Sequence, residues 1–170
     1  MTKTLILPGF SPKNKLWAED VVEGIKTYFE PVIIEWEHWK TDNKAPLNIP
    51  DETGKIKNLI GDAQVNVVAK SIGSLVTMHL IKAAVKFNKL ILAGIPINDL
   101  SQEDKNMYQY LAEIPKDKLL CIQNDADPHG SYNQIKELLT AVSPDILLVN
   151  KPAADHDYLY SSDFKTFLLR

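Results

Sequence analysis

Short runs of apolar residues recur along the chain, and most of them are separated by segments with a helical spacing of apolar positions. A strand that is buried on both faces is nearly continuous in Leu, Ile and Val, as in a parallel sheet covered by helices. Six runs have this character and are predicted to be strands: residues 4–7, 32–36, 65–69, 90–93, 119–123 and 146–149.

Between and after these runs, the spacing of apolar residues predicts six helices: residues 16–28, 51–60, 72–85, 101–111, 132–141 and 158–168. The helix over 72–85 has the clearest period, with apolar residues at i, i+3, i+4, i+8 and i+11 from Ile72. His79 falls beside this stripe and is expected to pack against the core. Strands that alternate with helices predict a three-layer α/β/α fold with a mostly parallel, six-stranded, doubly wound sheet. A length of 170 residues suits a single domain spanning 1–170.

Composition bears on the binding partners, the state of the cysteine and the location of the protein. A formal net charge of −3 gives no indication of nucleic acid or an acidic membrane as a partner. The single cysteine, Cys121, excludes an internal disulfide and lies in an apolar run, so a buried structural thiol is expected. The apolar stretch near the N-terminus is too short for the core of a signal peptide, and no run reaches membrane-spanning length. These observations predict a cytoplasmic protein.

Ser71 is the most informative residue. It follows the predicted strand 65–69 directly and precedes the predicted helix 72–85. Small residues, Ala69 and Gly73, lie two positions before and two positions after it. A serine at a tight strand-to-helix corner with small flanking residues is the setting of a nucleophile elbow. The alternative is a serine that merely caps the helix.

Further polar residues follow the other predicted strands. Ligands of an open parallel sheet bind beyond the carboxyl ends of its strands, so these residues are expected at one edge. Asp127 follows the fifth strand and His156 the sixth, which gives the chain order Ser71, Asp127, His156 expected of α/β-hydrolases. A phosphate-binding P-loop is excluded because Ala69 and Gln64 occupy its glycine positions. Dinucleotide-binding and zinc-binding spacings are also absent from the sequence, so no cofactor and no metal are expected.

With these residues in place, the chain resembles the small, lid-poor α/β-hydrolases, similar to the compact serine hydrolases of the retinoblastoma-binding-protein-9 and YdeN type. The resemblance covers nearly the whole chain. Proline replaces the usual histidine of the first motif, and alanine replaces the first glycine of the second. Four segments carry it: Leu7-Pro8-Gly9-Phe10, Ala69-Lys70-Ser71-Ile72-Gly73, Ile122-Gln123-Asn124-Asp125-Ala126-Asp127-Pro128 and Asp155-His156.

Acyl-transfer chemistry assigns the expected roles. The Ser71 hydroxyl becomes nucleophilic when His156 takes its proton, and Asp127 holds the imidazole in the required tautomer. The Ile72 N–H would be one oxyanion donor, and the resemblance implies the Phe10 N–H as the second. The expected substrate is a small carboxylic ester, thioester or amide.

Several alternatives stay open at this stage. Asp125 or Asp99 could supply the acid in place of Asp127. His129 could line the pocket or be a loop residue, and the loop interpretation is favoured. Trp36, His38 and Trp39 could border the site or simply pack. Because folds host many functions, a non-catalytic interaction module on a hydrolase fold is the second hypothesis. The sequence carries no signal for the identity of the acyl group or for the oligomeric state.

Overall fold

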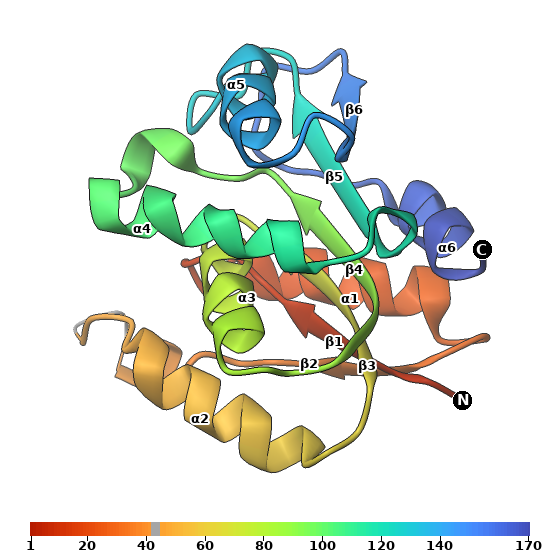
Figure 1. Cartoon of the computed structure of the whole chain (residues 1–170). Helices are drawn as coiled ribbons and strands as arrows, with labels where there is room; N and C mark the ends of the chain where they lie inside the picture. Colours follow the sequence, from red (N-terminus) through yellow and green to blue (C-terminus); the bar gives the residue numbers. More distant parts are fainter. Residues whose placement is uncertain (42–44) are drawn as a thin grey trace.

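The computed structural model describes residues 1–41 and 45–170. Within these residues, parallel strands form one six-stranded sheet in the order β2-β1-β3-β4-β5-β6 (Figure 1), which confirms the predicted sheet. The strands are β1 (Lys3–Leu7), β2 (Glu30–Ile33), β3 (Val65–Lys70), β4 (Phe87–Ala93), β5 (Leu119–Asn124) and β6 (Leu147–Lys151).

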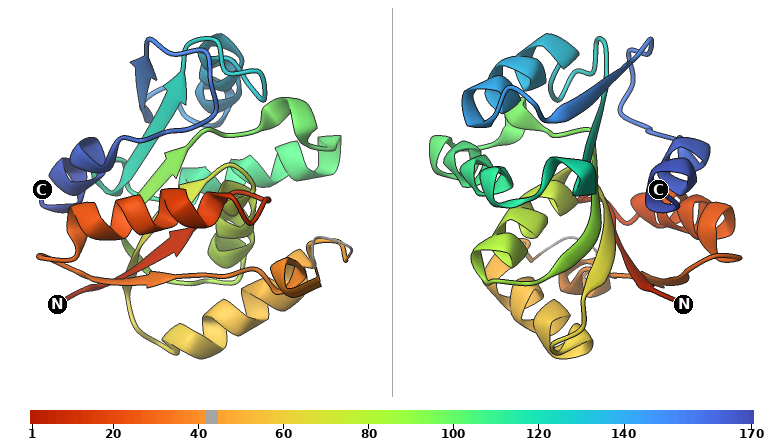
Figure 2. Two further views of the ribbon diagram at one scale, coloured as in Figure 1. Left: turned by 180° about the vertical axis from the view of Figure 1, so that it is seen from behind. Right: turned by 45° about the vertical axis from the view of Figure 1, so that its right-hand side comes forward.

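Helices cover both faces of the sheet and make three layers (Figure 2), as predicted. On one face, α1 (Asn14–Ile25) packs beside α6 (Ser161–Leu168). The opposite face carries α2 (Ile49–Ile60), α3 (Ile72–Lys82), α4 (Gln102–Met107) and α5 (Tyr132–Val142). The connections contain 3-10 turns, named η1 (Glu37–Thr41), η2 (Ile97–Asp99), η3 (Tyr108–Glu113) and η4 (Lys116–Lys118).

The strand residues divide between two apolar cores because successive side chains of a strand point to opposite faces. Ile6 and Val68 face α1 and α6, where Trp17 and Phe164 are also buried. Their neighbours Leu5 and Val67 belong to the core beneath the other helices. Every residue of β3 and β5 is buried, which explains why their sequences lack polar alternation.

The chain leaves the neighbouring strands β1 and β3 in opposite directions. After β1 it enters α1 on one face, and after β3 it enters α3 on the other. A crevice forms beyond the carboxyl ends of two strands whose connections diverge in this way. The segments that follow β1 and β3 therefore meet at one edge of the sheet.

Several predicted boundaries differ from the structure; the predicted helix 101–111, for example, is α4 followed by η3. Two of the differences have identifiable reasons. The second strand ends at Ile33 rather than at Trp36, because the fully buried Trp36 side chain turns toward the loop after β1. The last helix begins at Ser161 rather than at Tyr158, since Tyr158 has a positive φ of 58° and leaves the helical conformation. In both places a long-range hydrogen bond outweighs the local pattern.

Two side chains for which the sequence predicted packing in the core are buried or half-buried in the structure. Cys121 is buried, and burial raises the pKa of its thiol to about 12. His79 is half-buried on α3, where burial lowers the pKa of its imidazole. In residues 1–41 and 45–170, no helix combines the length and the hydropathy needed to cross a membrane.

Candidate active site

Ser71 occupies a strained corner between β3 and α3. Its backbone has φ 55° and ψ −124°, a region that residues with a side chain seldom adopt. Its N–H donates to the carbonyl of Ala93 on the adjacent strand β4, with a distance of 3.0 Å. Ser74 donates to the Ser71 carbonyl through both its N–H and its hydroxyl. The corner is therefore fastened on both sides of Ser71, which has the geometry of a nucleophile elbow.

The small residues around Ser71 are required by close packing. A Cβ atom at Gly73 would overlap the carbonyl oxygen of Leu7 in β1. Ala69, where the elbow pattern usually has glycine, is fully buried in the sheet and fits with its single methyl group. The close approach of β1 to the start of α3 thus explains the glycine two residues after Ser71.

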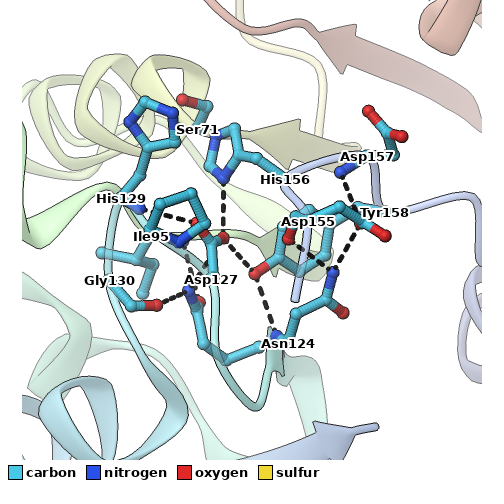
Figure 3. A network of polar contacts seen from close by, with 12 residues as sticks. Ser71, Ile95, Asn124, Asp127, His129, Gly130, Asp155, His156, Asp157 and Tyr158 are labelled. Carbon is cyan, nitrogen blue, oxygen red and sulfur yellow. Dashed lines mark hydrogen bonds and ion pairs between the residues drawn. The ribbon is translucent and has the colours of Figure 1, made fainter. Parts of the chain in front are cut away.

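His156 and Asp127 come together, although 29 residues separate them (Figure 3). The Nδ1 atom of His156 lies 2.6 Å from Oδ2 of Asp127, whose side chain has no exposed surface. The Tyr158 hydroxyl donates to the same Oδ2 at 2.6 Å, and the His129 N–H donates to Oδ1 at 2.8 Å. Burial alone would raise the pKa of Asp127, but the hydrogen bonds from His156 and Tyr158 outweigh it and lower the pKa. Asp127 is therefore held as a carboxylate.

This contact determines the orientation of the imidazole. Because a carboxylate accepts hydrogen bonds, Nδ1 of His156 carries the proton and Nε2 offers its lone pair. Nε2 is buried and has no hydrogen-bond partner in the described part of the chain. In Figure 3 the His156 ring lies between Asp127 and Ser71. The Ser71 hydroxyl makes no hydrogen bond to Nε2 within the described residues, and such bonds are often long before substrate binds.

The two other acid candidates have different partners. Asp125 is exposed and accepts a hydrogen bond from the Asn150 amide at 3.3 Å. Asp99, in η2, lies 2.5 Å from Nδ1 of His129. Of these three aspartates, Asp127 is the one that contacts His156.

His129 lies closer to the site than its interpretation as a loop residue implied. Its ring centroid is 4.4 Å from that of His156, and Figure 3 shows both rings near Ser71. Asp99 and His129 thus form a second acid–imidazole pair beside the first. The sequence signal was the short spacing of Asp127 and His129 in one loop, with Asp99 beyond the preceding strand.

Residues near the end of β5 hold the loops that carry Asp127 and His156. The buried Gln123 donates to the Gly130 carbonyl at 2.6 Å and accepts from the Ile95 N–H at 2.9 Å. The Asn124 amide donates to the Asp155 carbonyl at 2.9 Å. Neither amide was assigned a role from the sequence, because a polar residue at a strand end carries no distinctive local pattern.

Three ring N–H donors hold the loop after β1, named here the β1 loop (residues 8–11). Trp36 Nε1 lies 3.2 Å from the Pro8 carbonyl oxygen and 3.1 Å from that of Gly9. Nε2 of His38 and Nε1 of Trp39 lie 2.8 and 2.7 Å from the Phe10 carbonyl oxygen. The pattern Trp36-Glu37-His38-Trp39 therefore borders the site by fastening this loop.

Because the peptide bond is planar, the contact between Trp36 and the Gly9 carbonyl also determines the direction of the Phe10 N–H. In a trans peptide the C=O and the following N–H point to opposite sides. With the Gly9 carbonyl directed at Trp36, the Phe10 N–H points away from Trp36. Phe10 itself stacks on His38 at 4.5 Å between ring centroids, which further restricts the loop.

A cavity of about 620 Å³ opens beside His156. It lies between the start of α1 and the loop that carries His156, and its lining includes Asn14, Trp17, Lys70, His156 and Leu159. Among residues 1–41 and 45–170, no cluster of three or more His, Cys, Asp or Glu side chains could hold a metal ion.

Comparisons with known proteins agree with the architecture. The sequence matches no protein-family model and no curated protein. Its structure is similar to that of an α/β serine hydrolase homologue from Coxiella burnetii, with a TM-score of 0.73 and 14% identity over 99% of this chain and 84% of the other. A Xanthomonas campestris α/β serine hydrolase without a lid gives 0.67 and 15% identity over 98% and 78%. An esterase from Pyrococcus furiosus gives 0.68 and 15% identity over 99% and 81%. The chain therefore has the α/β-hydrolase fold.

Proposed function

We propose that this protein is a serine hydrolase that cleaves a small carboxylic ester, thioester or amide through an acyl-enzyme on Ser71. The observation that carries the proposal is the strained Ser71 corner beside an imidazole whose Nδ1 is held by Asp127 and whose Nε2 has no hydrogen-bond partner in the described residues. A general base must present a lone pair to the hydroxyl that it activates, and this tautomer does so.

The proposed reaction has two halves. Ser71 Oγ attacks the acyl carbon while its proton passes to Nε2 of His156, and Asp127 stabilises the imidazolium that forms. The tetrahedral intermediate collapses as His156 gives the proton to the leaving alcohol, thiol or amine. Water then attacks the acyl-enzyme with His156 as the base, and the acid is released with Ser71 restored.

Two backbone N–H groups are proposed to stabilise the oxyanion. Ile72 is the first residue of α3, where the N–H has no partner within the helix. The Phe10 N–H comes from the β1 loop. Donors that are already aimed at the developing charge contribute much of the rate of acyl transfer, and the loss of one donor typically costs about 10²–10³-fold.

A fluorophosphonate probe tests this proposal directly. The probe is expected to form a covalent adduct that peptide mass spectrometry maps to Ser71. Ser71→Ala should remain unlabelled, while Ser11→Ala, which removes a different serine near the site, should label like the parent protein. A folded parent protein that fails to label, or a Ser71→Ala variant that labels equally, would favour the interaction module instead.

The β1 loop contacts provide a second test. Trp39→Phe keeps an aromatic ring but removes one of the two donors to the Phe10 carbonyl. We expect kcat to fall by about 3–10-fold, a fraction of the loss of a whole oxyanion donor, while KM changes little because the contact matters mainly in the transition state. Steady-state kinetics on a p-nitrophenyl ester measures both. Lys40→Met, which removes an exposed ion pair in the same η1 turn, is the control and should leave kcat unchanged. A rise in KM at constant kcat would contradict the positioning role.

A further inference from the structure

Lys70, the residue before Ser71, has an unusual environment for an ammonium group. The residue is 5% exposed, and its Nζ atom donates to Oδ1 of Asn14 at 2.9 Å and lies 5.8 Å from the centre of the Trp17 ring. Within the described residues, no carboxylate lies at ion-pair distance from it. Burial lowers the pKa of Lys70, while the more distant Asp157, Asp127 and Asp155 act in the opposite direction. A buried charge without a close counter-ion is costly, so an anion that binds beside the Lys70 ammonium would lower this cost.

The cavity beside His156 is where such a partner could bind. Lys70 and His156 both line it, so a ligand there would lie next to the proposed general base. Its exposed rim includes two apolar side chains, Leu16 and Leu159, which are 73% and 64% exposed. The cavity thus combines a buried ammonium with an apolar entrance, the features that suit an acyl chain ending in a negative charge.

We propose that this cavity binds a carboxylate of the substrate, with the Lys70 ammonium as its partner. The proposal rests on the serine hydrolase function, since it describes the substrate of the same site. An ammonium has three N–H donors, and Asn14 accepts from one of them. A carboxylate would accept from another, and charge-assisted hydrogen bonds of this kind are about twice as strong as neutral ones.

The charged side chains that line the cavity around Lys70 bear on which class of anion can bind there. Lys13 and Asp157 also line the cavity, as does Asp20, whose carboxylate accepts a hydrogen bond from the Ser161 hydroxyl. With one further lysine and two aspartates in the lining, the formal charge apart from Lys70 is negative. Lys70 can neutralise one negative charge, and removing a dianion such as a phosphate monoester from water costs more than removing a single carboxylate, so a carboxylate suits this cavity better. The substrate class is therefore a half-ester or half-amide of a dicarboxylic acid.

Paired substrates test the inference. The p-nitrophenyl half-esters of succinate, glutarate and adipate are compared with their neutral methyl-capped counterparts. For the best chain length, kcat/KM is expected to be about 10–100-fold higher for the anionic member, the range of hydrogen bonds to charged groups. Acetate esters of 4-hydroxybenzoate and of its methyl ester place the charge on the leaving group instead. A preference confined to this second pair, equal rates in both pairs, or a neutral preference would overturn the inference.

Variants attribute the preference to Lys70. Lys70→Met should remove the anionic preference, Lys70→Arg should keep part of it, and Lys15→Met, a lysine paired with Glu35 outside the cavity, should keep it whole. Because both esters are measured on one preparation, the ratio does not depend on the folded fraction. An anionic preference that survives in Lys70→Met contradicts the assignment.

A binding measurement separates this inference from the proposed function. Titration of glutarate into Ser71→Ala, followed by tryptophan fluorescence, requires no hydrolysis and uses Trp17 as a reporter near Lys70. Saturable binding that is lost in the additional Lys70→Met variant supports the anion site even if the parent protein proves inactive. Absence of glutarate binding in Ser71→Ala, with a parent protein that labels at Ser71, overturns the anion site and leaves the hydrolase proposal standing.

Discussion

Replacement of Asp127 by asparagine is expected to lower kcat by about 10³–10⁴-fold, the loss typical of a triad acid. The carboxylate accepts the Nδ1 proton of His156 at 2.6 Å and leaves the Nε2 lone pair free. An asparagine amide can donate to Nδ1 instead, which moves the imidazole proton to Nε2 and removes the base. The variant would lose the proposed proton acceptor while its shape stayed nearly unchanged.

Asp125→Asn is the matched control, because it makes the same chemical change two residues away in the same loop. Asp125 is exposed and bonded to Asn150, so kcat is expected to stay within about twofold of the parent value, as for most surface changes. Hydrolysis of a p-nitrophenyl ester measures both variants, and thermal unfolding reports whether each is folded. A larger loss in Asp125→Asn than in Asp127→Asn would mean that the wrong carboxylate has been assigned.

Replacement of Gly73 by alanine is expected to lower the free energy of unfolding by about 1–3 kcal/mol, the usual cost of overpacking a core. Two effects oppose each other at this position. Alanine is favoured over glycine inside a helix by about 1 kcal/mol. The added Cβ would nevertheless overlap the Leu7 carbonyl oxygen, a backbone atom of a central strand that cannot move aside cheaply. The overlap should prevail, and the displaced elbow should also slow fluorophosphonate labelling of Ser71.

Gly54→Ala isolates the helical preference without the overlap. Gly54 lies in α2, and a Cβ there would meet nothing within 4 Å. This variant should gain about 0.5–1 kcal/mol of stability and label at the normal rate. Urea unfolding measures both free energies. If Gly73→Ala proves as stable as Gly54→Ala, the packing explanation of the glycine at position 73 is wrong.

The architecture was predictable because it depends on local patterns. A strand buried on both faces is apolar at most positions, and four of the six residues of β3 are, the exceptions being Asn66 and Lys70. The apolar stripe that begins at Ile72 likewise predicted α3. At two of the shifted boundaries, a side chain had a distant partner: Trp36 turned to the Pro8 and Gly9 carbonyls, and Tyr158 to Asp127.

The site itself was only partly predictable. Ser71 could be identified because an elbow imposes small residues on its immediate neighbours, and that constraint is written in consecutive positions. The partner of His156 could not be chosen in this way. Asp99, Asp125 and Asp127 all follow strands of one sheet edge. The resemblance favoured Asp127, but only the folded loop determines which carboxylate turns inward.

The local sequence was enough to identify a parallel sheet and a serine at a tight strand-to-helix corner, since neighbouring residues determine both. The pairing of Asp127 with His156, the fastening of the β1 loop by three aromatic rings, and the placement of Lys70 beside a cavity with an apolar rim arise from folding. Each of these depends on the direction in which a loop side chain points, and that direction is determined by packing and hydrogen bonds from residues far away in the sequence.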